Sequence, residues 1–184
     1  MALGATVYKA TVDISDLDRS YYAKHVLTVA RHPSETEERL MLRVLAFCRH
    51  AGERTEFGRG LSTEGEPALW ELDDTGAIAE WVDVGWPDVK QVRRAAGRSA
   101  AVTIFTYDEA RYVLWWEQNA GEFSKIDKLC VIAVDDAFVA ALAAMADRNM
   151  RLAVTIQDGV AWVSDDARSV EVTFKVLKET NSRW

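Results

Sequence analysis

The sequence contains little of what marks several classes of protein. Its 184 residues include 2 cysteines, 3 prolines and 10 glycines. The two cysteines, Cys48 and Cys130, form neither a disulfide framework nor a metal-binding motif by their spacing, and so little proline and glycine excludes collagen-like and low-complexity chains. No apolar run reaches the ~18 residues of a membrane-spanning helix, and the first residues lack the basic and apolar segments of a signal peptide. We therefore expect a soluble, cytoplasmic protein with no membrane partner.

What is present is the composition of one folded domain with a surplus of acidic residues. Apolar residues make up 49% of the chain, and 22 basic residues against 29 acidic ones give a net charge of −7. At about 150 residues per domain, this length predicts a single domain over residues 1–184. The acidic surplus argues against a protein whose main role is non-specific binding of duplex nucleic acid, because that binding depends on Lys and Arg. Basic residues in the middle of the chain form either a local basic surface or ordinary solvated helix faces: Arg39, Arg43, Arg49, Arg54, Arg59, Lys90, Arg93, Arg94 and Arg98.

Apolar periodicity and turn residues predict strands and helices along the whole chain. The expected strands are Thr6–Ile14, Tyr21–Arg31, Thr55–Leu61, Ala68–Leu72, Ile78–Val84, Ala100–Tyr107, Leu129–Val134, Met150–Ile156, Val160–Val163 and Val170–Val176. The expected helices are 34–51, 87–96 and 135–147, and Tyr112–Gln118 is read as either a strand or a helix. Residues 34–107 are thus predicted to run helix, three strands, helix, strand.

Specific residues define the ends of three of these elements. Ser34 is the expected N-cap of the first helix, in a capping box with Glu37. Pro87 is the expected first residue of the second helix, where proline fits well. Asp158-Gly159 predicts a tight hairpin between two strands.

Common catalytic motifs are absent, so the carboxylates carry most of the chemical information. The chain has no nucleophile-elbow serine, P-loop, dinucleotide fingerprint or zinc-protease motif, and its three histidines lack metal-ligand spacing. Glu38 lies at the edge of the apolar face of the first helix, beside Met41 and Leu45. A charge there needs a partner, which is either a basic side chain such as Arg59 or a bound cation.

A second pair of carboxylates depends on the register of two neighbouring strands. Asp83 shares one face of its strand with Trp81. If residues 74–75 form a two-residue turn, Glu66 falls opposite Asp83, whereas a bulge at Gly76 would shift this pairing. Opposed carboxylates suggest a shared proton or a divalent cation; the alternative is a frayed strand end with both acids in solvent.

Several strings of residues resemble the YaeQ family of bacterial proteins. They are ATVYKAT at 5–11, ARHPSET at 30–36, FGRGL at 57–61, FTY at 105–107 and TIQDGV at 155–160. That family in turn resembles the PD-(D/E)XK nuclease fold, whose core runs helix, three strands, helix, strand. The fold class expected from this resemblance is α+β, a mixed β-sheet flanked by helices. The nuclease-like core would lie at about 34–107, with an added N-terminal hairpin and added C-terminal strands.

The resemblance implies a site for phosphodiester hydrolysis. Glu38 corresponds to the glutamate of the first helix, Glu66 to the acid of the second strand and Asp83 to the acid of the third, with Glu66 and Asp83 as ligands of Mg²⁺ or Mn²⁺. Glu66-Pro67 reverses the usual order of proline and acid, and Gly85 stands where the family's lysine is expected.

Three further residues complete the predicted site. The role of the missing lysine is assigned to Lys90 or Gln91 in the next helix, although the helical phase of Lys90 also fits an ordinary surface lysine. Arg59 either contacts a substrate phosphate or pairs with Glu38.

Two functions from different classes follow from these features. The first is a divalent-metal-dependent phosphodiesterase or nuclease, acting on nucleic acid, whose activity is complete or degenerate. The alternative is a non-catalytic module that retains the fold and binds nucleic acid or a protein partner. Such a module would use a tryptophan-rich surface around Trp115 and Trp116, unless that pair fills the core.

Overall fold

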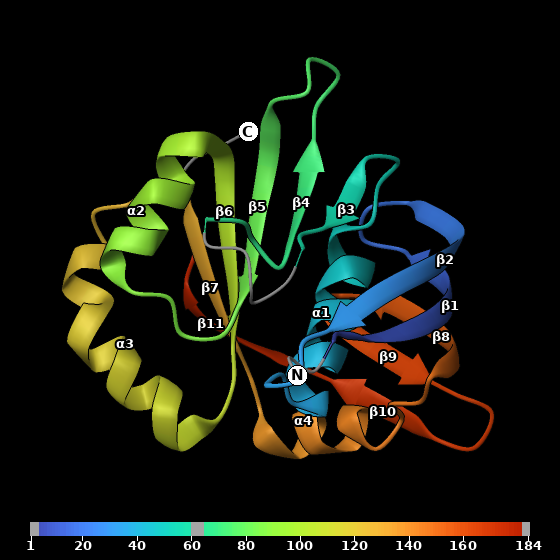
Figure 1. Ribbon diagram of the computed structural model, residues 1–184. Helices are drawn as coiled ribbons and strands as arrows, with labels where there is room; N and C mark the ends of the chain where they lie inside the picture. Colours follow the sequence, from blue (N-terminus) through green and yellow to red (C-terminus); the bar gives the residue numbers. More distant parts are fainter. Residues whose placement is uncertain (1–3, 60–64, 182–184) are drawn as a thin grey trace.

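The computed structural model describes residues 4–59 and 65–181, and two β-sheets enclose one helix within them (Figure 1). The strands are β1 Thr6–Asp16, β2 Tyr21–Arg31, β3 Thr55–Phe57, β4 Leu69–Leu72, β5 Ile78–Val84, β6 Ser99–Thr106, β7 Leu129–Val134, β8 Asn149–Gln157, β9 Val160–Ser164, β10 Ser169–Val172 and β11 Phe174–Lys178. The helices are α1 Glu37–His50, α2 Val89–Arg98, α3 Glu109–Phe123 and α4 Asp136–Ala143. One sheet has the order β10-β9-β8-β1-β2 and the other β11-β7-β6-β5-β4-β3.

Helix α1 lies between the two sheets, and this position explains its composition. All residues from Leu40 to Cys48 are buried, including Arg43. The apolar residues among them belong to one cluster with inward-facing residues of β1, β5 and β8. A helix covered on both sides needs apolar residues around a wide arc.

The second sheet is mixed and carries helices on both faces. Strands β5, β6 and β7 are parallel to one another, while β3, β4 and β11 pair antiparallel with their neighbours. Helices α2 and α3 cover the face opposite α1 (Figure 1), where Trp81, Trp115 and Phe123 form a second buried cluster. The α+β class is therefore correct, and the order α1-β3-β4-β5-α2-β6 is the one predicted for residues 34–107.

The starts of two helices differ from the prediction. Thr36, not Ser34, is the N-cap of α1, and its hydroxyl oxygen accepts a hydrogen bond from the backbone N–H of Arg39. The Ser34 hydroxyl instead lies 2.6 Å from Nδ1 of His32, so the predicted capping box with Glu37 is wrong. Pro87 lies outside α2, directly before its N-cap Asp88.

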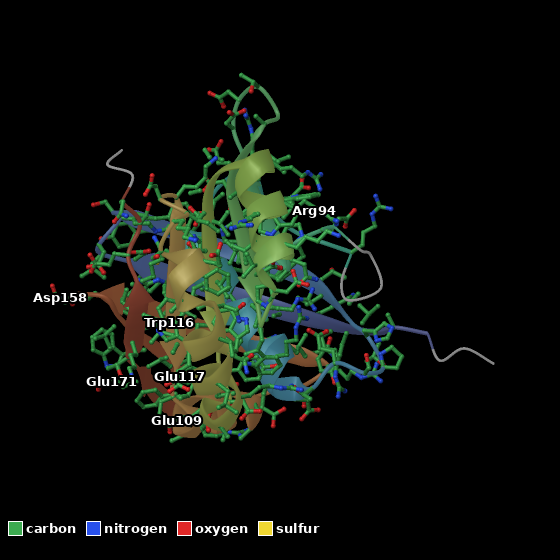
Figure 2. All side chains as sticks on the ribbon, turned by 90° about the vertical axis from the view of Figure 1, so that its left-hand side faces the viewer. Arg94, Glu109, Trp116, Glu117, Asp158 and Glu171 are labelled. Atoms are coloured by element: carbon green, nitrogen blue, oxygen red, sulfur yellow. The ribbon has the colours of Figure 1, made fainter. Side chains whose placement is uncertain are left out.

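The C-terminal strands also differ in one respect. The predicted strand Val170–Val176 is two strands, because β10 pairs with β9 in the first sheet and β11 pairs with β7 in the second. The predicted hairpin at Asp158-Gly159 is confirmed, with positive φ angles of 52° and 75°. Figure 2 shows Asp158 at the tip of that turn.

Other boundaries agree within a few residues. The ambiguous segment Tyr112–Gln118 is part of helix α3. Of the described part of the predicted strand Thr55–Leu61, Thr55–Phe57 forms a strand, and residues 60 and 61 lie outside the described residues. In the part of the chain that the structure describes, no helix has both the length and the apolar character needed to cross a bilayer.

Candidate functional site

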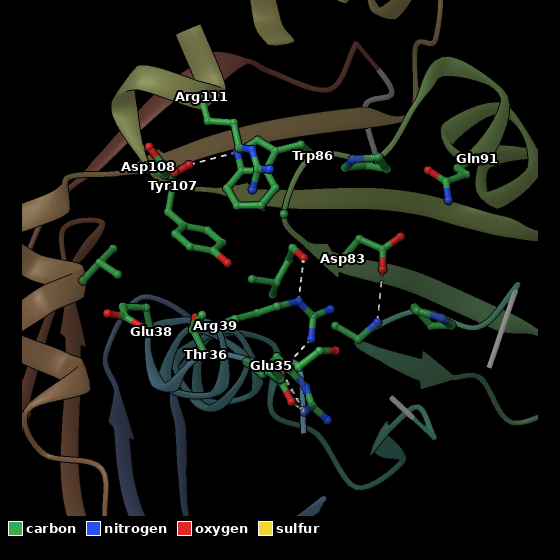
Figure 3. A pocket seen from close by; sticks show the side chains of 18 of the residues that line it. Glu35, Thr36, Glu38, Arg39, Asp83, Trp86, Gln91, Tyr107, Asp108 and Arg111 are labelled. Carbon is green, nitrogen blue, oxygen red and sulfur yellow. Dashed lines mark hydrogen bonds and ion pairs between the residues drawn. The ribbon is translucent and has the colours of Figure 1, made fainter. Parts of the chain in front are cut away.

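A pocket of about 900 Å³ opens at the carboxyl ends of β5 and β6, between the start of α1 and the starts of α2, α3 and α4 (Figure 3). Ligands of open α/β sheets bind at this edge, beyond the carboxyl ends of the parallel strands. Four of the predicted site residues line the pocket: Glu38, Glu66, Asp83 and Gln91. Among the described lining residues, neither Lys90 nor Arg59 is included.

Asp83 is held at the end of β5 by two hydrogen bonds. Its Oδ1 accepts from the backbone N–H of Ala68 at 3.1 Å, and its Oδ2 accepts from Nε1 of Trp81 at 2.9 Å. The shared face predicted for Trp81 and Asp83 is therefore correct. Burial raises the pKa of the Asp83 carboxyl above its ordinary value, and the two hydrogen bonds and the charge of Arg39 oppose this only in part.

The register beside Asp83 is the shifted alternative. Strands β4 and β5 pair Leu69 with Val82, and the register shifts between Glu71 and Leu72. The turn that joins these strands includes Gly76, which has a φ of +83°. The three-residue loop 74–76, with this left-handed glycine at its end, shifts the pairing by one residue, and the irregularity at Ala79, between the pairs Leu72–Ile78 and Glu71–Glu80, shifts it by a second. As a result Ala68, rather than Glu66, is the neighbour of Asp83.

Glu66 is bonded to Arg59. Its Oε2 accepts from the Arg59 backbone N–H at 3.0 Å, and its Oε1 lies 3.1 Å from Nε of the same residue. The Glu66 side chain is 14% exposed, whereas that of Arg59 is 80% exposed. Arg59 therefore pairs with Glu66 and not with Glu38.

Glu38 faces the pocket from the first turn of α1 (Figure 3). Its carboxylate forms no hydrogen bond or ion pair with any other residue that the structure describes. An unpaired carboxylate at the rim of a pocket remains free to accept a proton or a hydrogen bond from a ligand.

Gln91 has a structural function at the start of α2. Its Oε1 accepts from the backbone N–H of Asp88 at 2.9 Å, while its own N–H donates to the Asp88 carboxylate at 2.7 Å. This reciprocal pair is a capping box. The side-chain NH₂ group of Gln91 remains available to a ligand in the pocket. Lys90, the preceding residue, is exposed.

Gly85 has a backbone conformation that disfavours the lysine expected here from the resemblance to the nuclease fold. Its φ is +131°, and its N–H donates to the carbonyl of Phe105 at 2.9 Å. A Cβ atom built at this position would meet nothing within 4 Å. Backbone strain, and not lack of space, therefore opposes a side chain at residue 85.

A buried charged group that the sequence analysis did not identify lies on the α1 side of the pocket. The Glu35 carboxylate, 1% exposed, is shared by two arginines: Nη1 of Arg39 at 2.5 Å from Oε1, and Nη1 of Arg43 at 3.0 Å from Oε2. The side chain of Arg39 is 14% exposed and that of Arg43 only 1%. The spacing of four residues between Glu35, Arg39 and Arg43 is the only signal in the sequence.

The opposite wall of the pocket is aromatic. Nε1 of Trp86 donates to the carbonyl of Tyr107 at 2.9 Å, and the two ring centroids are 4.8 Å apart. The guanidinium carbon of Arg111 lies 4.3 Å from the centroid of the Trp86 ring. These contacts fix the wall in one conformation and bring a positive charge to it.

The tryptophan pair considered as a docking surface packs against the second core cluster, which Trp86 of this wall also contacts. Because the segment is helical rather than extended, Trp115 points into the second core cluster and donates from Nε1 to the carbonyl of Pro87 at 2.8 Å. Trp116 is half-buried and packs against the same cluster. The alternative that this pair fills the core is therefore correct.

The described carboxylates, histidines and cysteines do not form a ready metal cage. Within residues 4–59 and 65–181, no group of three or more such side chains is arranged to hold a metal ion. The predicted ligands Glu66 and Asp83 both line the pocket. The assignment of Mg²⁺ or Mn²⁺ to them stays a prediction.

Comparison with known proteins identifies the family. A model of the YaeQ protein family matches residues 1–174. The uncharacterized protein YaeQ of Escherichia coli (strain K12) is 46% identical over 179 residues, or 97% of this chain and 99% of the relative. Its counterpart from Salmonella typhi is 43% identical over 172 residues, or 94% and 95% of the two chains.

Two solved structures resemble the whole fold. The crystal structure of the YaeQ protein from Xanthomonas axonopodis pv. citri has a TM-score of 0.91 at 45% identity, and it covers 95% of this chain and 98% of its own. The YaeQ protein from Pseudomonas syringae has a TM-score of 0.91 at 32% identity, with 97% and 98% covered. On the evidence of the family model, the curated relatives and the crystal structures, the chain belongs to the YaeQ family.

Proposed function

We propose that the pocket binds a phosphate ester and that the protein is a divalent-metal-dependent phosphodiesterase of the nuclease-like type. The observation that carries this proposal is that all four helices of the described chain begin at the pocket. The lining includes Thr36 at the N-cap of α1, Pro87 directly before the N-cap of α2, Asp108 at the N-cap of α3 and Asp136 at the start of α4. The positive ends of helix dipoles attract anions, although a capping side chain already accepts from one N–H group at the start of each helix.

The pocket contains charged side chains of both signs, which favours a site for a phosphate and a divalent cation together over a site for an anion alone. Arg39, Arg94 and Arg111 add positive charge to that of the helix ends, but Glu38 and Asp83 also face the same space. A phosphate group and these carboxylates repel each other. A divalent cation between them would remove that repulsion, as it does where phosphates and carboxylates share one ion.

The donor set fits Mg²⁺ bound in that way. This ion retains several waters and takes one or two carboxylates together with substrate phosphate oxygens. Asp83 and Glu66 would supply the carboxylates, and each Asp83 oxygen accepts one hydrogen bond, which leaves lone pairs for an ion. When bound, the ion polarises the phosphoryl group and lowers the pKa of a coordinated water.

The chain's own residues have distinct functions in this proposal. The N–H groups of Ala68 and Trp81 orient the Asp83 carboxylate. Glu38, which has no described partner, accepts a proton from the attacking water. The NH₂ group of Gln91 is a donor that can orient a phosphate oxygen.

The test is a calorimetric titration with Mn²⁺ and Mg²⁺, with and without the phosphodiester bis(p-nitrophenyl) phosphate, followed by assays of nitrophenol release. We expect metal binding in the presence of the diester and metal-dependent release of nitrophenol. Both should be lost in Asp83→Ala and kept in Asp13→Ala, whose carboxylate is 62% exposed on the other sheet. Absence of metal binding with the diester present would refute the phosphodiesterase.

A second candidate is a non-catalytic module that binds nucleic acid through the same pocket. Gly85 favours it, because removal of one donor that stabilises transition-state charge lowers a rate by about 10²–10³-fold. The same titration with a single-stranded oligonucleotide separates the two functions. Binding of the oligonucleotide without any metal-dependent cleavage would select the module.

A further inference from the structure

We infer that Arg39 is the phosphate-anchoring cation of this pocket and that it allows an oxyanion to bind without a divalent ion. The inference rests on the proposed phosphate-ester function and adds to it the residue and the ligand group. It assigns to a residue of α1 the positive charge that Gly85 cannot provide.

The first argument is the balance of buried charge. Glu35 carries one negative charge, and Arg39 and Arg43 carry two positive ones, with all three side chains at most 14% exposed. The group therefore has a net charge of +1 in a largely desolvated place. Such a surplus is costly unless an anion lies nearby.

The neighbouring acids do not provide this anion directly. Asp83 faces Arg39 across the pocket but forms no ion pair with it, and Glu38 is likewise unpaired. Asp108 and Asp136 also line the pocket, where Asp136 accepts a hydrogen bond from the backbone N–H of Glu109, and neither forms an ion pair with Arg39. A bound oxyanion between Arg39 and the helix N-termini would balance the charge.

The second argument is the orientation of the guanidinium. Nε of Arg39 donates to the carbonyl of Val84 at 3.2 Å, and Nη1 donates to Glu35. An arginine has five N–H donors, and Nη2 makes no hydrogen bond to any residue that the structure describes. Figure 3 shows the guanidinium in the pocket between Asp83, Tyr107 and Glu35. These two contacts lie on opposite sides of the guanidinium and hold it in place (Figure 3), which leaves Nη2 between them as the donor for a ligand.

The third argument is position. Val84 immediately precedes Gly85, so the hydrogen bond to its carbonyl brings the guanidinium to the end of β5 where a side chain at residue 85 would begin. Arginine donors match the oxygens of both carboxylate and phosphate groups. The proposed phosphate-ester function selects a phosphate monoester or diester oxyanion as the ligand group.

The experiment is titration of the metal-free protein, in the presence of EDTA, with inorganic phosphate and then with bis(p-nitrophenyl) phosphate. Binding should weaken at least about tenfold in Arg39→Gln, because a charge-assisted hydrogen bond is lost. It should be partly restored in Arg39→Lys, which keeps the charge but not the fork. Arg93→Gln is the matched control, since Arg93 pairs with Glu122 outside the pocket.

A purely structural role for Arg39 would lower stability without a change in anion affinity, so thermal unfolding of each variant is recorded beside the titration. If Arg39→Gln does not fold, the Nε–H resonance of Arg39 in the unaltered protein serves instead, and it should shift on addition of phosphate while that of Arg93 does not. Unchanged affinity in a folded Arg39→Gln, or no metal-free phosphate binding by the unaltered protein, overturns the inference. Neither result refutes the phosphodiesterase, which is decided by metal binding and cleavage in the Asp83→Ala comparison.

Discussion

Replacement of Gly85 by alanine or lysine tests whether backbone conformation alone keeps a side chain out of this position. A Cβ atom here would meet nothing within 4 Å, and φ is +131°. A residue with a Cβ in such a Gly-favouring conformation costs about 1–3 kcal/mol. Because the cost comes from the backbone, Gly85→Ala and Gly85→Lys should lower the free energy of unfolding by nearly the same amount.

Gly97 is a control in the same part of the molecule. It lies within α2, it is exposed, and a Cβ there also meets nothing within 4 Å. Alanine in a helix is favoured over glycine by about 1 kcal/mol, so Gly97→Ala should raise stability. Gly85→Ala should therefore be less stable than the unaltered protein and Gly97→Ala more stable. The free energies of unfolding of the two variants should differ by roughly 2–4 kcal/mol.

Urea unfolding with a common slope measures this difference directly, and thermal unfolding gives a second measurement. For a chain of this size, 1 kcal/mol corresponds to a change in Tm of about 2–4 °C. If Gly85→Ala and Gly97→Ala have the same stability, the explanation of Gly85 by its backbone angle is wrong. If Gly85→Lys is much less stable than Gly85→Ala, side-chain crowding is the cause instead.

Three further changes have expected results. Burial, with the positive charges of nearby arginines, lowers the pKa of His50 to about 3, so the unfolded chain binds this proton first as the pH falls below about 6.5. The free energy of unfolding should then decrease on acidification by up to about 1.4 kcal/mol per pH unit between those two pKa values. In urea titrations from pH 7 to pH 4, His50→Gln should show a shallower decrease than the unaltered protein, and equal slopes would contradict this. In Gly58→Ala the new Cβ would lie 2.0 Å from the carbonyl oxygen of Pro67, so the free energy of unfolding measured in urea should fall by about 2–3 kcal/mol. A fall below about 0.5 kcal/mol would show that the backbone at Pro67 moves aside easily. Glu35→Gln leaves two buried guanidinium groups without a counter-charge and should cost about 3–5 kcal/mol by thermal or urea unfolding; a near-neutral result would mean that both arginines find other partners.

Local patterns predict the parts of this fold that depend on neighbouring residues. Val84 ends β5 as predicted, Asp158-Gly159 forms the predicted turn, and the order from α1 to β6 is correct. Each depends on periodicity or on the conformational preference of one or two residues. The same reasoning failed at Ser34, because Thr36 is an equally good N-cap two residues later and the local sequence does not decide between them.

Register and sheet membership depend on contacts that no local pattern contains. One extra residue in the turn at Gly76 and a second at Ala79 move Ala68 rather than Glu66 beside Asp83, and no local pattern fixes such a shift. The segment 170–176 has the alternation of a single strand, but its two halves pair with β9 and β7 in different sheets. A break of this kind is decided by the positions of the partner strands, which are distant in the chain.

The charged group on α1 shows why the site itself was only partly predictable. Arginines spaced along a helix are usually solvated, and nothing local distinguishes Arg39 and Arg43 from such residues. They are buried because two sheets enclose α1, and Glu35 is buried with them. A comparison by position with the nuclease fold records only that the lysine expected at Gly85 is absent, whereas the fold brings a guanidinium to the same strand end from a residue 45 positions before Val84. In a pocket built from four helix N-termini and two strand ends, the charge at a given place can come from any of these elements. The function of this pocket is consequently decided by which side chains converge in space, and Arg39 is the residue whose substitution tests that directly.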